Sequence, residues 1–163
     1  MKTQVLYALD LEQTYWRTFL AHCELFPGVR DFLLALRSSG IGTAIITDLT
    51  SQIQFRKIIY FGLDDCFDSV VTSEEAGADK PHDAPFRLAI DKLGLDPQSI
   101  WMVGDHPVND VAGARPFGMT TLLRVDKASG DSAGDSGCDV VFDDFRDLHR
   151  HVFSGKVEGI ARR

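Results

Sequence analysis

Two aspartates with four residues between them follow a short apolar run, and their type and spacing suit a magnesium ion. Gly104 and Asp105 come directly after the apolar run 99–103, which predicts a buried strand, and Asp110 follows about one helical turn later. Open α/β sheets bind their ligands at the carboxyl ends of strands. Mg²⁺ accepts a few hard carboxylate oxygens while it keeps waters and takes an oxygen from a phosphate. Asp105 and Asp110 are therefore candidate metal ligands; alternatively, Asp105 is a turn residue and Asp110 caps a helix predicted from Val111.

A second segment could hold a phosphate group. The apolar run 43–47 predicts a strand that carries the Thr47 hydroxyl to its carboxyl end, with Asp48 next along the chain. Thr50 or Ser51 can cap the helix that follows. The free N–H groups of that helix and the Thr47 hydroxyl would together form a phosphate seat. The alternative is an ordinary turn with a capped helix, which this segment taken alone favours.

A lysine held next to a proline is the third candidate. Pro81 keeps Lys80 out of helical geometry and in an extended conformation. A strand is predicted before this lysine and a helix after it. A lysine fixed in this way can point its compact cation at a phosphate, although a solvated loop lysine is the common alternative.

These candidates need a sheet whose strand ends lie along one edge, and the chain predicts such a sheet. Apolar runs of strand length alternate with helical patterns, which is typical of parallel βαβ units and a doubly wound α/β sheet. A loop is predicted at 128–137, where Ser, Gly and Asp are frequent. The expected strands are 43–47, 68–72, 99–103, 120–125 and 139–142, and the expected helices are 4–21, 29–37, 51–60, 85–93, 111–114 and 145–153.

Composition limits the classes of partner. The chain has 163 residues, which suits one domain with a sizeable core, and a net charge of −7. This charge argues against nucleic acid and gives no reason to expect binding to anionic membranes. No apolar run approaches the ~20 residues that span a bilayer. Three widely spaced cysteines, Cys23, Cys66 and Cys138, predict reduced thiols in a cytoplasmic protein and argue against a zinc site.

The order and spacing of Thr47, Lys80 and the Asp105/Asp110 pair resemble the second, third and fourth motifs of the haloacid dehalogenase (HAD) superfamily. The resemblance covers residues 5–125 and implies a Rossmann-like parallel sheet sandwiched by helices. It also implies a Mg²⁺-dependent phosphatase of the capped branch, acting on a small phosphorylated metabolite. The Gly-Asp metal motif favours a phosphatase over a dehalogenase. The similar connecting segments are Leu25-Phe-Pro-Gly28-Val29, Tyr60-Phe-Gly-Leu63, Cys66-Phe67-Asp68, Thr72-Ser-Glu-Glu75, Ala112-Gly-Ala114 and Gly118-Met119.

The resemblance also implies a role for each motif residue. Thr47 would hold a phosphoryl oxygen, and Lys80 would neutralise charge on the phosphate and on the nucleophile. Asp105 would bind Mg²⁺ directly, and Asp110 directly or through water. Asp48 stands where Asn is commonest in the family and adds a negative charge beside the phosphate seat. The phosphoryl group would pass to an aspartate, and water would hydrolyse the aspartyl-phosphate.

The nucleophile motif of the family, Asp-x-Asp-x-Thr at the end of the first strand, has no clear counterpart. The run 5–14 offers Asp10 as nucleophile and Glu12 as acid/base, but its helical stepping continues to Leu20 without a turn residue. We favour residues 1–24 as an N-terminal helix similar to the end of a cap domain, over a degenerate first strand. Residues 25–153 would form the HAD-like core and 154–163 a C-terminal tail.

This choice affects the sheet. The first-motif strand is central in the family, between the strands that carry Thr47 and Asp105. If residues 5–9 are helical, two inner strand edges stay unpaired, which invites self-association or a strand-donating partner. The nucleophile would then come from upstream sequence. Two functions follow as alternatives: a phosphatase, or a non-catalytic HAD-like module that binds phosphate or a partner protein.

Overall fold

The computed structural model describes residues 3–126, 134 and 136–154. The predicted loop 128–137 lies largely outside these ranges, as does all of the predicted tail except Ser154. No helix in the described ranges is both long enough and apolar enough to cross a membrane. The helices are α1 (Gln4–Ala21), α2 (Val29–Ser38), α3 (Ser51–Tyr60), α4 (Ser73–Ala76), α5 (Asp83–Leu93) and α6 (Phe145–Phe153), and the strands are β1 (Ala44–Thr47), β2 (Ser69–Thr72), β3 (Trp101–Gly104), β4 (Thr120–Arg124) and β5 (Val140–Phe142).

All the strands pair in parallel, as the alternation of elements predicts. They form two separate groups, β1-β2 and β3-β4-β5, and β1 is not hydrogen-bonded to β3. In the first group Thr47 lies opposite Thr72, and in the second Gly104 lies opposite Leu123. The sheet is therefore divided between the two strands that carry the candidate site residues.

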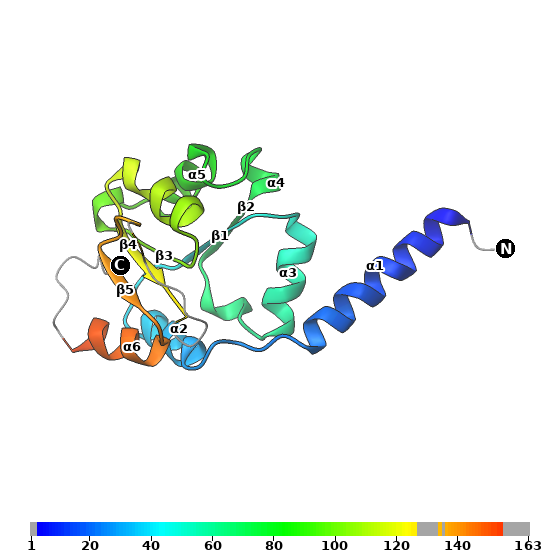
Figure 1. Ribbon diagram of the computed structural model, residues 1–163, viewed down its shortest axis with the longest axis horizontal. Helices are drawn as coiled ribbons and strands as arrows, with labels where there is room; N and C mark the ends of the chain where they lie inside the picture. Colours follow the sequence, from blue (N-terminus) through cyan, green and yellow to red (C-terminus); the bar gives the residue numbers. More distant parts are fainter. Residues whose placement is uncertain (1–2, 127–133, 135, 155–163) are drawn as a thin grey trace.

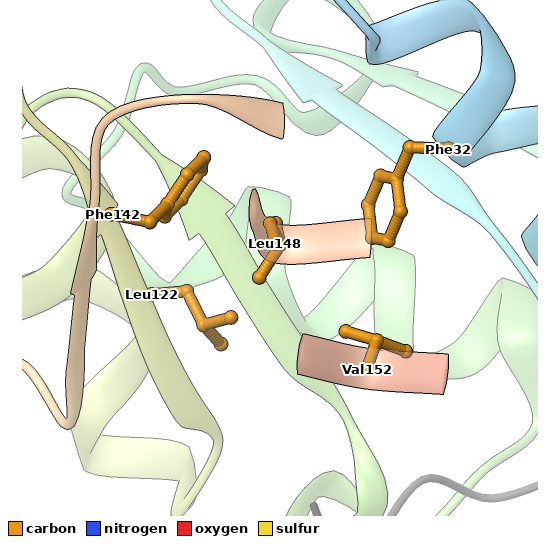
Figure 2. Packing of buried hydrophobic residues seen from close by; sticks show 5 residues of the cluster. All are labelled: Phe32, Leu122, Phe142, Leu148 and Val152. Carbon is orange, nitrogen blue, oxygen red and sulfur yellow. The ribbon is translucent and has the colours of Figure 1, made fainter. Parts of the chain in front are cut away.

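Helices cover both faces of the sheet (Figure 1), which is the Rossmann-like sandwich expected from the sequence. On one face, α2 and α6 pack on β4 and β5 through Phe32, Leu122, Phe142, Leu148 and Val152 (Figure 2). On the other face, α5 brings its fully buried Phe86 into a cluster with Ala114 and Met119. Adjacent residues Leu122 and Leu123 belong to clusters on opposite faces, because successive side chains of a strand alternate.

The first helix, α1, covers residues 5–9, so this run is not a strand. The helix projects away from the rest of the chain (Figure 1), and Leu20 is its only buried residue. Most of its large apolar side chains are exposed, including Val5, whose exposed fraction is 76%. The helix predicted over 4–21 is confirmed, while its origin as the end of a cap domain stays a prediction.

The burial of the strands reflects the division of the sheet. In β4, which has a neighbour on each side, Thr121, Leu122 and Leu123 are at most 1% exposed. In β1, all four residues are only partly buried, although three of them are apolar. In β3, Val103 is 36% exposed. The strands beside the division therefore lack the cover that a central strand has in a doubly wound sheet.

Two helical segments differ from the sequence prediction. The segment after Thr72 was expected to be a loop, but it forms the short helix α4, with the Thr72 hydroxyl accepting from the Glu75 N–H at 3.2 Å. The spacing of Thr72 and Glu75 is that of a capping box, which is a sequence signal for the start of a helix. The helix expected from Val111 begins earlier, as the π-helical turn η3 (Pro107–Ala112).

The α2/α6 cluster should carry a large share of the stability. Leu148 is 2% exposed in this cluster, whereas Leu34 of α2 is 46% exposed. We expect Leu148→Ala to lower the free energy of unfolding by about 2–5 kcal/mol, because it leaves a cavity. The matched change Leu34→Ala should stay within about 0.5 kcal/mol. Urea denaturation measures both, and equal losses would contradict the packing described here.

Candidate active site

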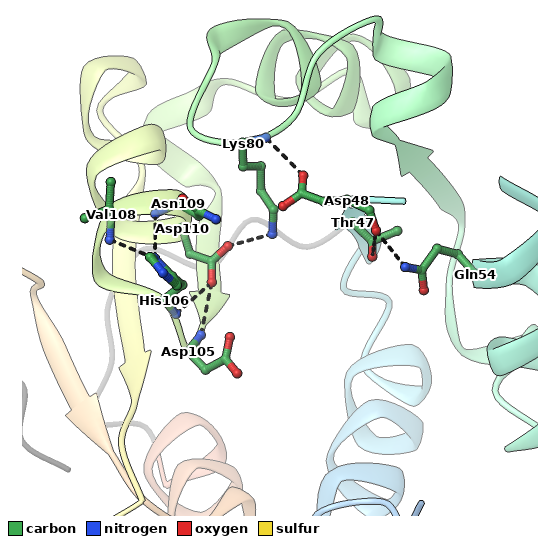
Figure 3. A network of polar contacts seen from close by, with 9 residues as sticks. All are labelled: Thr47, Asp48, Gln54, Lys80, Asp105, His106, Val108, Asn109 and Asp110. Atoms are coloured by element: carbon green, nitrogen blue, oxygen red, sulfur yellow. Dashed lines mark hydrogen bonds and ion pairs between the residues drawn. The ribbon is translucent and has the colours of Figure 1, made fainter. Parts of the chain in front are cut away.

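Lys80 lies between the two halves of the sheet and contacts both. Its Nζ is 2.7 Å from Oδ1 of Asp110, which follows β3, and its backbone N–H donates to Oδ1 of Asp48, which follows β1, at 3.0 Å (Figure 3). The side chains of Lys80 and Asp110 are 12% and 5% exposed. Both strands therefore end beside this lysine and run in the same direction. Asp48, Lys80 and Asp110 therefore lie together at this edge, and Thr47 precedes Asp48 at the end of β1; their roles in binding and catalysis stay predictions.

Thr47 and Asp48 form the carboxyl end of β1. The Thr47 hydroxyl donates to the Asp48 carbonyl at the long distance of 3.4 Å, and the Gln54 side chain donates to the same carbonyl at 2.7 Å. Gln54 is a buried polar residue of α3. It fixes the backbone at Asp48, and so it supports the loop that holds Lys80. The sequence analysis missed Gln54, since nothing distinguishes it from a surface residue of an amphipathic helix.

The turn after Asp48 is strained and is held by the neighbouring segment. Leu49 has a φ of 99° and is the only non-glycine residue with a positive φ in the described ranges. An L side chain in this region costs on the order of 1–3 kcal/mol and persists only where surrounding contacts enforce it. The Leu49 N–H donates to the Ser73 hydroxyl at 3.1 Å, which is one such contact. Strain of this kind is concentrated at functional sites.

The N-terminus of α3, considered above as part of a phosphate seat, has its first N–H group already hydrogen-bonded. Thr50 is its N-cap but makes no side-chain cap bond. The Ser51 N–H instead donates to the Glu74 carboxylate at 2.8 Å. Hydrogen bonds from Ser51, first from its backbone N–H and to a smaller extent from its hydroxyl, hold the pKa of the Glu74 carboxyl below its ordinary value. The first N–H of α3 is therefore already used by an acidic side chain, and a phosphate would depend on Thr47 and Lys80.

Asp110 is fully engaged with the protein. Its Oδ2 accepts from the backbone N–H groups of Asp105 and His106 at 3.1 and 3.0 Å, while its Oδ1 faces Lys80. A Cβ on Gly104 would overlap this carboxylate, which explains the glycine before Asp105. Asp105 takes part in the contacts of Figure 3 only through its backbone, and its carboxylate is exposed.

The turn after β3 is capped by His106, so Asp110 does not have the capping role considered as an alternative. His106 Nδ1 accepts from the N–H groups of Val108 and Asn109 at 3.3 and 3.0 Å. These two hydrogen bonds orient the turn in which Asp110 is buried. A π-helical turn is a common feature of functional sites. The histidine cap was not expected from sequence, because the usual capping residues are Ser, Thr, Asp and Asn.

Asp10 is not part of this group of residues. It lies in α1, which projects away from the sheet (Figure 1), so the residues at the strand ends come from the later motifs alone. Within the described ranges, no group of three or more His, Cys, Asp or Glu side chains is arranged to hold a metal ion by itself. The residues brought together here can neutralise an anion and offer one exposed carboxylate, that of Asp105.

The Lys80–Asp110 pair gives a test of this geometry. Removing the charge of Asp110 leaves the ammonium of Lys80 buried without a counterion, so Asp110→Asn should lower the free energy of unfolding by about 3–5 kcal/mol. Asp105→Asn, the same change at an exposed carboxylate, should alter it by less than about 0.5 kcal/mol. Urea denaturation of both variants provides the comparison. Similar losses would show that the buried pair is not formed in solution.

Comparison with known proteins assigns the chain to a family. Ribulose-1,5-bisphosphate 5-phosphatase of Halopiger xanaduensis is 39% identical over 116 residues, which are 71% of this chain and 48% of that protein. Glyceraldehyde 3-phosphate phosphatase of Pyrococcus abyssi is 37% identical over 108 residues, 66% of this chain and 45% of that protein. This chain thus spans less than half the length of these two relatives.

A solved structure agrees with these relatives. The crystal structure of an HAD phosphatase from Thermococcus onnurineus matches with a TM-score of 0.76 and 28% identity, covering 86% of this chain and 64% of that one. Residues 6–123 match the family described as haloacid dehalogenase-like hydrolase. This match covers well over half of the chain and includes every residue of the candidate site. The chain therefore belongs to the haloacid dehalogenase-like hydrolase family.

Proposed function

We propose that the protein is a Mg²⁺-dependent phosphatase that acts on a small phosphorylated metabolite through an aspartyl-phosphate. The observation that carries this proposal is Lys80, whose ammonium is 2.7 Å from Oδ1 of Asp110 after β3 and whose backbone N–H donates to Asp48 after β1. The names of the two curated relatives, phosphatases of ribulose-1,5-bisphosphate and glyceraldehyde 3-phosphate, support a substrate of this class. Because the chain spans less than half of each relative, the activity of the whole protein is part of the proposal. A cytoplasmic location and the lack of a nucleic-acid partner remain predictions.

In this proposal the chain binds and neutralises the phosphoryl group. The Thr47 hydroxyl is free to turn toward a phosphoryl oxygen, because its bond to the Asp48 carbonyl is long. The Lys80 ammonium is fixed by Asp110, so it needs little reorganisation when a dianion arrives. Asp48 adds a negative charge beside the seat and thereby disfavours a ligand that carries a second anionic group close to its phosphate.

The acidic residues fit a magnesium ion that keeps several of its waters. Asp105 offers an exposed carboxylate as a direct ligand, whereas both carboxylate oxygens of Asp110 already accept hydrogen bonds. Asp110 therefore acts through water or by orienting Lys80. One or two protein carboxylates suffice for Mg²⁺ that also takes substrate oxygens. A bound ion at this position polarises the phosphoryl oxygens.

The nucleophile is the missing part of the proposal. Asp10 lies in α1 rather than beside Lys80. We propose that the attacking aspartate belongs to a segment other than those described, from upstream sequence or from a strand-donating partner. The same observation favours the second candidate function, a non-catalytic module that binds phosphate without turnover.

Hydrolysis of p-nitrophenyl phosphate separates these functions. We expect the purified 163-residue chain to show little Mg²⁺-dependent hydrolysis, because its described site residues include no assigned nucleophile. Robust turnover that disappears in Asp10→Asn would contradict the placement of Asp10 away from the site. Turnover that survives Asp10→Asn would mean that another residue of this chain is the nucleophile.

Metal binding tests the role of Asp105 without requiring turnover. Titration calorimetry with Mg²⁺ should show binding to the chain that Asp105→Asn weakens by at least about tenfold, since a direct ligand is lost. Asp65→Asn removes a highly exposed carboxylate outside the site and serves as the matched control. Equal affinities for the two variants would exclude Asp105 as a ligand.

A further inference from the structure

Arg124 ends β4 beside the candidate metal ligand Asp105. Gly104 of β3 lies opposite Leu123 of β4, so the next residues of these two parallel strands are Asp105 and Arg124. Neighbouring strands are about 4.8 Å apart. The half-buried side chain of Arg124 therefore leaves the sheet at the same edge as Asp105, on the adjacent strand.

An aromatic ring holds the guanidinium of Arg124. Its Cζ lies 3.7 Å from the ring centroid of Phe26, which precedes α2. Phe26 in turn stacks on Phe145, the first residue of α6, with 6.4 Å between the ring centroids. A guanidinium stacked on a ring keeps its N–H donors in its own plane, so the stacking positions the cation without using those donors.

The donors of Arg124 have no acidic partner within the described part of the chain. Its Nε is buried and hydrogen-bonds to no acceptor there. The guanidinium also forms no ion pair with Asp105 in these ranges, although the two residues are neighbours in register. Buried polar groups of native proteins nearly always have a partner. A donor without an acceptor at this position points to an acceptor that arrives with a ligand.

Arg87 of α5 shows how a stacked arginine is otherwise paired in this protein. Its guanidinium lies 5.3 Å from the ring centroid of Phe117, and its Nε also donates to Oδ2 of Asp83 at 2.8 Å. The chain has 24 acidic and 17 basic residues, so acidic partners are abundant. Arg124 is also stacked on a phenylalanine, but it lacks the carboxylate that Arg87 has.

Asp48 and Arg124 place opposite charges at different parts of the candidate site. Asp48 follows β1 and binds the Lys80 N–H, whereas Arg124 ends β4. β1 and β4 belong to different groups of strands, and β3, which leads to Asp105, is the neighbour of β4. A phosphate at Lys80 and Asp105 would therefore meet a negative charge on the β1 side and a positive charge on the β4 side. A second anionic group is favoured only toward β4.

We propose that Arg124 is a specificity-determining residue that binds a second anionic group of the phosphorylated metabolite, either a carboxylate or another phosphate. This group accepts two N–H bonds from the edge of the guanidinium, the bidentate geometry that arginine forms with both kinds of anion. The two anionic groups of the ligand are then one to two strand spacings apart, about 5–10 Å. The inference rests on the proposed function, because it requires a phosphate at Lys80 and Asp105.

Three non-hydrolysable probes test this inference without requiring turnover. Pentane-1,5-diyl bisphosphonate and 6-phosphonohexanoate each carry a second anionic group, and pentylphosphonate lacks one. Titration calorimetry in the presence of Mg²⁺ measures their binding to the 163-residue chain. We expect at least one of the first two to bind at least about tenfold more tightly than pentylphosphonate, because it gains charge-assisted hydrogen bonds to Arg124. The tighter of the two identifies the second group.

Substitutions of the two stacked arginines assign the preference to one residue. Arg124→Gln removes the charge, so it should abolish the preference for the dianionic probe and leave the affinity for pentylphosphonate unchanged. Arg87→Gln is the matched control at the other stacked arginine and should keep the full preference. Arg124→Lys keeps the charge but loses the planar fork, so it should restore only part of the preference.

Three results would overturn the inference. They are equal affinity of the unaltered chain for all three probes, equal weakening of all three by Arg124→Gln, or a preference that Arg124→Gln leaves unchanged. Equal weakening would mean that Arg124 serves the phosphate site as a whole and does not recognise a second group. The comparison of probes on the unaltered chain still decides the result if Arg124→Gln unfolds. Failure of the proposed function would differ, because pentylphosphonate would then show no Mg²⁺-dependent binding either.

Discussion

The site depends on a buried ion pair between two segments that follow different strands. The Lys80 ammonium and the Asp110 carboxylate are both largely removed from water and are 2.7 Å apart. Either charge alone would be costly at this depth. Asp110 also accepts two backbone N–H groups, and Asp48 holds the Lys80 backbone. The pair therefore fixes the cation and links the ends of β1 and β3, which are not hydrogen-bonded to each other in the described part of the chain.

The residues of the site are held in place although the sheet is divided into two groups of strands. Helix α5 packs against residues of both β1 and β3, so the two halves of the sheet keep one orientation although they do not hydrogen-bond to each other. The groups that would hold and neutralise a phosphate are positioned by this packing.

The two aspartates of the Gly-Asp motif have different environments in spite of their identical chemistry. Asp110 is buried and uses its carboxylate to order the backbone and Lys80, whereas the Asp105 carboxylate is exposed. A ligand can therefore approach only one of them without breaking existing hydrogen bonds. The Glu74 carboxylate likewise accepts from the Ser51 N–H, the first of α3, so this group is not free for a ligand.

The sequence alone predicted the alternation of strands and helices and a place for Lys80 at the strand ends, where it contacts Asp48 after β1 and Asp110 after β3. Apolar runs of strand length alternate with helical patterns, and the carboxyl ends of parallel strands lie along one edge of a sheet. The helical stepping of residues 4–21 also indicated that the sheet would lack a strand, and the separate β1-β2 and β3-β4-β5 groups agree with this.

Only the tertiary structure decided how the side chains at that edge are used. Lys80 and Asp110 are 30 positions apart in the chain, and Ser51 and Glu74 are 23 apart. Local propensity carries no information about such pairs, because the packing of α4, α5 and η3 on the strands brings them together. The histidine cap of η3 and the support of Asp48 by Gln54 depend on the same packing. Residue type therefore specified the chemistry available to the chain, and burial determined which groups remain free for a ligand.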